Sequence, residues 1–83
     1  MRRIENVTSY EALQYLKRVR AGGEPVSRDG TVVVPVRCGE CEIWFGRKHA
    51  RLKWLDLDKL VLHKFSGNIC QAAARLAELE PRI

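Results

Sequence analysis

Basic and aromatic side chains alternate in the segment between Trp44 and Trp54. Such mixtures are typical of nucleic-acid binders, because Lys and Arg neutralise phosphates and aromatic faces stack on unpaired bases. Trp54 and Phe45 are more typical of a core, whereas strand alternation places Trp44 on the face opposite Phe45 and favours it for stacking. We therefore predict a nucleic-acid-binding surface made of Trp44, Arg47, Lys48, His49, Arg51 and Lys53. The competing interpretation is a charged turn and sheet edge that discourages aggregation.

The pair Cys38 and Cys41 has the spacing of a zinc knuckle, which makes both residues candidate zinc ligands. His49, His63 or Cys70 could complete a tetrahedral shell. No second close pair of cysteines follows, and a tight turn between two strands already accounts for the first pair. We therefore expect no metal and no cofactor, and keep a zinc-stabilised mini-domain as an alternative. Three cysteines cannot all pair within one chain, so we expect reduced thiols.

Residues for catalysis do not assemble into a known pattern. The sequence contains no convincing nucleophile beside a base, no paired carboxylates and no glycine-rich loop for phosphates. Asp56 and Asp58 are close together, but they are typical of the start of a helix. His49 and His63 are typical surface or core histidines. We therefore expect a protein that is not an enzyme.

Two helices are predicted, one near each end of the chain. Thr8 and Glu11 form a capping-box pattern, apolar residues recur at helical spacing after it, and Gly22-Gly23 ends the run. Asn68 and Gln71 form a second capping box before an apolar stripe, so a closing helix is expected up to about residue 80.

Strand-forming residues fill the middle of the chain. Residues 31–36 and 41–45 are predicted to form a hairpin around Gly39-Glu40, with Cys38 facing Cys41. This register puts Val34, Val36, Ile43 and Phe45 on one face. Pro35 lacks an N–H group, so its strand is expected at an edge or with broken pairing there. Residues 50–55 are predicted as a third strand. Residues 57–65 favour a helix, with a short fourth strand at 60–62 as the alternative.

These elements predict a single small α+β domain spanning residues 1–83. It consists of an N-terminal helix, a three-stranded antiparallel sheet and one or two C-terminal helices. The 83 residues are 46% hydrophobic and 30% charged, which is an ordinary globular balance. The longest apolar run is far too short to span a membrane, and the start at residues 1–5 lacks the apolar stretch of a signal peptide. We therefore expect a cytoplasmic protein with no membrane partner.

Charge and size indicate which partners to expect. The net charge of +5 favours an acidic partner, so we predict an accessory or regulatory protein that binds DNA or RNA. The alternative is a non-catalytic module that binds a larger protein partner, as phage- or plasmid-type inhibitors of enzymes or assemblies do. A domain of this size buries only about 60–65% of the surface of its unfolded chain, which favours a homo-oligomer such as a dimer.

Two partial resemblances concern the predicted helices. The pattern of Gly67-Asn68, Ala72-Ala73 and Leu76 is similar to the first helix of the helix-turn-helix in Fis-type DNA-binding domains, but Ala77-Glu78 stands where that family has a tight turn. The order of a helix, three strands and a helix resembles the double-stranded-RNA-binding fold, without that family's lysine cluster at the start of the closing helix. We carry no residue roles over from either family.

Overall fold

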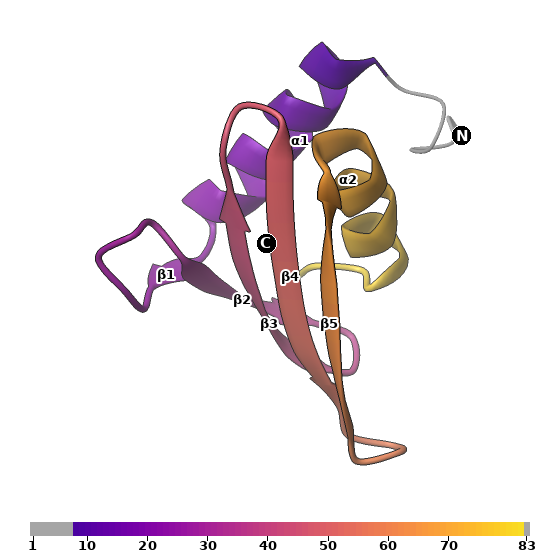
Figure 1. The fold of residues 1–83 in the computed structure, drawn as a ribbon. Coiled ribbons are helices and arrows are strands. Elements are labelled where there is room, and N and C mark those ends of the chain that lie inside the picture. The colour runs from indigo at the N-terminus through magenta and orange to yellow at the C-terminus, as the bar shows by residue number, and fades with distance from the viewer. Residues whose placement is uncertain (1–7, 83) are drawn as a thin grey trace.

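Two helices cover one face of a five-stranded antiparallel sheet in the computed structural model, which describes residues 8–82 (Figure 1). Neighbouring strands in the sheet are also neighbours along the chain, so every connection between strands is a hairpin. In chain order the elements are α1 (Ser9–Ala21), β1 (Glu24–Pro25), β2 (Val32–Val36), β3 (Gly39–Phe45), β4 (His49–Asp56), β5 (Val61–Asn68) and α2 (Ile69–Glu78).

Both predicted helices are confirmed, and each begins at its predicted capping box. The Thr8 hydroxyl accepts a hydrogen bond from the Glu11 amide at 3.2 Å, and the Glu11 carboxylate accepts one from the Thr8 amide at 3.4 Å. Asn68 and Gln71 repeat this exchange at the start of α2, at 2.8 and 3.4 Å. These contacts satisfy amides that lack partners within the helix, and they depend only on residues close together in sequence.

The prediction of a three-stranded sheet is wrong, because the sheet has five strands. β1 is a two-residue strand between α1 and β2, in a segment for which no strand was predicted. Residues 61–68 form β5 rather than the favoured helix, and they pair with β4 along its whole length. Asp56 accepts hydrogen bonds from the amides of Asp58 and Lys59 at 3.0 and 3.3 Å, which closes a hairpin turn instead of starting a helix. Leu60 ends this turn with a φ of 55°.

The predicted register between β2 and β3 is also wrong, although the predicted core face is right. Val36 pairs with Gly39 and Val34 with Cys41, so the turn lies at residues 37–38 and Cys38 does not face Cys41. In the predicted register Val32 would face Arg47, beyond the end of β3, whereas the observed one pairs all of β2. The shift is by an even number of residues, so the side chains keep their faces. Val34, Val36 and Ile43 are buried, and Phe45 packs against the core.

At Pro35, β2 is paired with β3 but no longer with β1. β1 pairs only with Val32 and Val33, while Pro35 pairs with Glu40 on the β3 side. The segment after α2 covers this part of β2: the Arg82 amide donates to the Pro35 carbonyl at 2.8 Å. The expectation of broken pairing at Pro35 is therefore right for one side of the strand.

The core lies between the helices and one face of the sheet. It includes Leu16 of α1, Ile43 and Leu52 of the sheet and Leu76 of α2, all almost fully buried. Burying each such side chain contributes roughly 1.5–3 kcal/mol. In β4 the buried residues Ala50, Leu52 and Trp54 alternate with exposed ones, so the other face of the sheet is open.

The structure bears on the membrane prediction in one respect. Within residues 8–82, no helix has the length and apolar character needed to span a bilayer. The start at residues 1–5, on which the expectation of no signal peptide rests, lies outside the described residues.

Candidate nucleic-acid interface on the open sheet face

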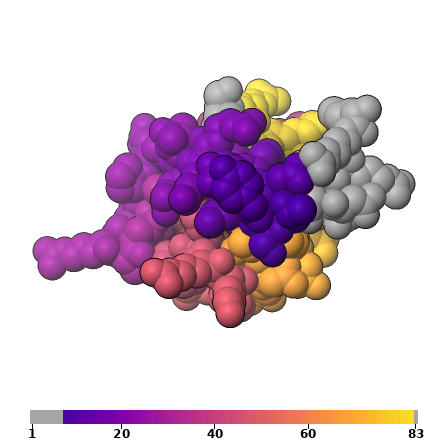
Figure 2. Space-filling view, turned by 90° about the horizontal axis from the view of Figure 1, so that it is seen from above, coloured from indigo at the N-terminus to yellow at the C-terminus, as the bar shows by residue number. Residues whose placement is uncertain are grey.

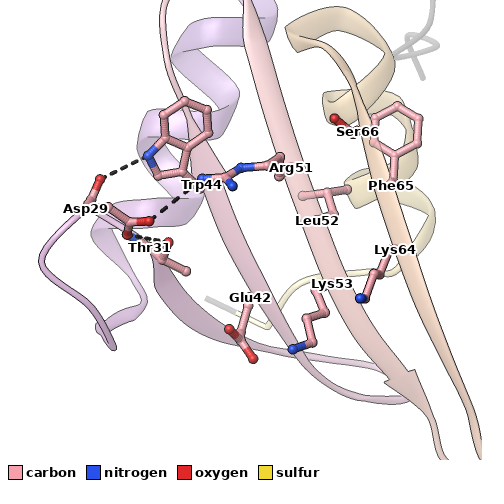
Figure 3. A pocket seen from close by; sticks show the side chains of 10 residues that line it. All are labelled: Asp29, Thr31, Glu42, Trp44, Arg51, Leu52, Lys53, Lys64, Phe65 and Ser66. Carbon is pink, nitrogen blue, oxygen red and sulfur yellow. Dashed lines mark hydrogen bonds and ion pairs between the residues drawn. The ribbon is translucent and has the colours of Figure 1, made fainter.

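Side chains from three neighbouring strands gather on the open face of the sheet (Figure 3). Trp44 of β3 pairs with Arg51 of β4, which pairs with Ser66 of β5. In the next row, Glu42 pairs with Lys53, which pairs with Lys64. These rows border a groove of about 420 Å³, within the range of small-molecule sites. Its lining consists of Asp29, Thr31, Glu42, Trp44, Arg51, Leu52, Lys53, Lys64, Phe65 and Ser66.

Trp44 is held at one side of this groove by polar contacts. Its indole Nε1 donates a hydrogen bond of 3.0 Å to the Asp29 carbonyl. The Arg51 guanidinium lies 4.5 Å from the centre of the indole ring, and one of its nitrogens lies 3.7 Å from the Asp29 carboxylate. A cation over an indole face is attracted by the ring quadrupole. Trp44 and Arg51 therefore form a stacked pair whose position depends on the loop before β2.

Asp29 supplies a fixed negative charge beside this pair. Hydrogen bonds from the Ser27 hydroxyl, and then from the Thr31 hydroxyl and amide, lower the pKa of Asp29 from 3.8 to about 2. Asp29 is therefore ionised at neutral pH. With Glu42 on the same face, the groove carries both signs of charge, and its cations are Arg51, Lys53 and Lys64.

The structure divides the predicted surface into two parts. Trp44, Arg51 and Lys53 lie together in the groove, and His49 lies on the same face, sharing a 2.8 Å hydrogen bond with Ser66. Arg47 and Lys48 are exposed in the turn between β3 and β4. Figure 2 shows this turn at the same end of the molecule as the start of α1. This segment is not a sheet edge, because β4 has β3 on one side and β5 on the other.

Seven of the residues that line the groove were absent from the predicted surface: Asp29, Thr31, Glu42, Leu52, Lys64, Phe65 and Ser66. Lys64 was missed because residues 57–65 favoured a helix, and Ser66 directly follows that segment, for which no strand was predicted. The signal that could have found them is the alternation of side-chain types in the sequence, where His63 and Phe65 alternate with Lys64 and Ser66. Asp29 precedes Gly30, and this pair is typical of a turn, so the sequence did not mark Asp29 as part of a binding surface.

The aromatic residues predicted for the core are on the helix side of the sheet. Trp54 is 9% exposed and stacks on His63, with ring centres 5.2 Å apart. Phe45 is partly buried, and the Arg20 guanidinium lies 4.4 Å from the centre of its ring. The assignment of Trp44 to the opposite face is therefore right, and Trp44 lines the groove from that open face.

The cysteine positions do not fit a zinc site. Cys41 is buried in the core, and this burial raises the pKa of its thiol to about 12, which disfavours the thiolate that zinc requires. His49 projects from the opposite, open face of the sheet, away from Cys41. Across residues 8–82, no three His, Cys, Asp or Glu side chains come together in a way that could hold a metal ion.

The comparisons with known proteins found no match. No family model matches the chain, and no curated protein or solved structure is significantly similar to it. The functional argument therefore rests on the open sheet face and its side chains.

Proposed function

We propose that this protein is a small, non-catalytic accessory or regulatory protein of the cytoplasm that binds single-stranded RNA or DNA on the open face of its sheet. The observation that carries the proposal is the row in which Lys53 lies directly opposite Lys64. Like charges opposite one another destabilise a sheet, and a phosphate between them offsets that repulsion.

The other row of the groove supplies contacts for a base. The plane of the Arg51 guanidinium and the half-buried Trp44 ring are both surfaces on which an unpaired base stacks. The Ser66 hydroxyl and the His49 imidazole lie on the same face and can hydrogen-bond to sugar or base edges. The lysine row and the Trp44 row are neighbours on the sheet. One strand of nucleic acid can therefore place a phosphate at the first row and an adjacent base at the second.

Single strands suit this surface better than duplexes do. The open face is a shallow sheet surface, and among residues 8–82 no helix projects from it to enter a major groove. Sequence-tolerant binding to single strands combines cations along the backbone with aromatic stacking. The groove offers both.

The test is a salt titration with labelled oligo(U) and oligo(dT). Binding should weaken as salt rises, and for single strands each phosphate contact contributes about 0.7 to the slope of log affinity against log salt. Lys53→Ala combined with Lys64→Ala should therefore reduce the slope by about 1.4. Lys17→Ala combined with Arg18→Ala is the matched control, because it removes the same charge from the exposed surface of α1.

The control pair should change the slope much less than the groove pair. Equal effects would show that only the net charge matters and would contradict a site on the open face. No detectable binding of either oligonucleotide at about 50 mM salt would end the proposal, since phosphate contacts are strongest there.

A further inference from the structure

The outer edge of β5 has no partner strand among residues 8–82. The β4–β5 hairpin extends beyond the rest of the molecule at the end away from the start of α1 (Figure 1). Near its tip, Leu60, Val61 and Leu62 are 77%, 46% and 51% exposed. A long edge strand with exposed aliphatic residues is a template for pairing with another strand.

The main-chain groups of β5 that face outward are identified by a hydrogen bond at its end. The Ile69 amide donates to the Lys48 carbonyl at 3.2 Å, which continues the β4–β5 ladder. In an antiparallel ladder such bonds recur at every second residue, so the odd-numbered residues of β5 bond to β4. Leu62, Lys64 and Ser66 therefore direct their amides and carbonyls away from the sheet.

A groove lies beside the other end of β5, between Phe65 and α2. The Arg75 guanidinium lies 5.6 Å from the centre of the Phe65 ring. The groove is lined by Phe65, Asn68, Cys70, Gln71, Ala74, Arg75 and Glu78. Phe65 faces the helix side of the sheet, as Val61 does at the other end of the strand.

We propose that the outer edge of β5 pairs antiparallel with β5 of a second copy of this chain, about a two-fold axis at His63. Each His63 then faces the other, and each Val61 faces Phe65 of the second copy. Each Leu62 lies against the aliphatic stem of Lys64 of the second copy on the open face. Outward main-chain groups of Leu62 and Lys64 pair across the axis.

A second copy fits this edge because the strand carries two complementary features. An exposed aliphatic residue, Val61, and a groove beside Phe65 lie at equal distances from His63, which is the arrangement an isologous interface requires. A register centred on Lys64 would put two lysines directly opposite one another. A register centred on Leu62 would leave the groove beside Phe65 empty.

The charges make this inference distinguishable from the proposed function. Each copy carries a net charge of +5, so association between copies must overcome repulsion that salt screens. Salt should therefore strengthen the dimer while it weakens nucleic-acid binding. The dimer does not depend on nucleic acid, and either proposal can fail without the other.

The first experiment measures the sedimentation of the free protein as a function of concentration at about 0.5 M NaCl, where charge repulsion is largely screened. The wild-type protein should shift from monomer to dimer as its concentration rises. Val61→Asp should remain a monomer with an unchanged circular dichroism spectrum, because this side chain is half exposed in the single copy. Val26→Asp is the matched control, since Val26 is 50% exposed in the loop after β1, and it should dimerise like the wild type.

The second experiment tests the register. In a Cys38→Ser, Cys70→Ser background, His63→Cys should form a disulfide-linked dimer. The two His63 residues would form a non-hydrogen-bonded antiparallel pair, in which the Cα atoms are about 4.5 Å apart. Lys64→Cys should crosslink far more slowly. The proposal is wrong if the wild type stays monomeric at high concentration and salt, if Val61→Asp dimerises normally, or if Lys64→Cys crosslinks as fast as His63→Cys.

Discussion

The adjacent glycines after α1 should respond in opposite ways to the same substitution. Gly23 lies against β2: a Cβ atom added there would be 2.6 Å from Val34 Cγ1 and 2.8 Å from the Val33 carbonyl oxygen. A side chain can rotate away, but the carbonyl belongs to a paired strand and can move only with the sheet. Gly22 is exposed, with φ −89° and ψ 0°, a conformation that alanine adopts.

The magnitudes follow from these contacts. Overpacking of this kind costs about 1–3 kcal/mol, so Gly23→Ala should lower the free energy of unfolding by that amount. For a domain of this size each kcal/mol lowers Tm by roughly 4–8 °C. Gly22→Ala should be neutral or stabilising by up to about 1 kcal/mol, because alanine reduces the entropy of the unfolded chain.

Urea and thermal unfolding of the two variants and the wild type, followed by circular dichroism, measure this difference. The slope of unfolding free energy against urea should be the same in all three proteins, because the fold is unchanged. A Gly23→Ala variant as stable as the wild type would refute the close approach of this segment to β2. So would a Gly22→Ala variant that is destabilised as much as Gly23→Ala.

Three further predictions concern single residues. Asn68→Ala should lower the free energy of unfolding by about 1 kcal/mol in urea titrations, because it removes the cap of α2; an unchanged midpoint would contradict this role. A thiol reagent should label Cys38 and Cys70 in the folded protein and Cys41 only after unfolding, since burial raises the pKa of the Cys41 thiol to about 12. Mass spectrometry of the labelled peptides measures this order, and early labelling of Cys41 would argue against its burial. The folded pKa of Asp29 is lowered, so its stabilisation is present above pH 3.8 and should be lost as the pH falls towards about 2. Asp29→Asn should lack this component of the acid transition, and identical Tm profiles between pH 5 and pH 2 in wild type and variant would contradict it.

Sequence alone determined the two helices because their signals are local. Thr8 with Glu11 and Asn68 with Gln71 satisfy free amides within one turn, whatever the rest of the chain does. The alternation in β4 could also be predicted from the sequence. Its residues that face the core are apolar, and most of the residues between them, which face solvent, are polar.

Tertiary structure decided what local patterns left open. Leu57, Leu60, Val61 and Phe65 have helical spacing, but pairing with all of β4 makes residues 61–68 a strand, because hydrogen bonds between strands depend on residues distant in sequence. The turn between β2 and β3 could lie at 37–38 or 39–40 with the same faces buried, and pairing along the whole of β2 selects the first.

The residues of the candidate site divide in the same way, into those that a local pattern predicts and those that tertiary structure adds. Trp44, Arg51 and Lys53 could be predicted because they lie in strands with clear alternation. Lys64 joins them only because β5 forms beside β4, and Asp29 approaches Trp44 only because the loop before β2 folds over the sheet. A sequence specifies which residues prefer one face of a strand, whereas which strands lie side by side is set by packing of the whole chain.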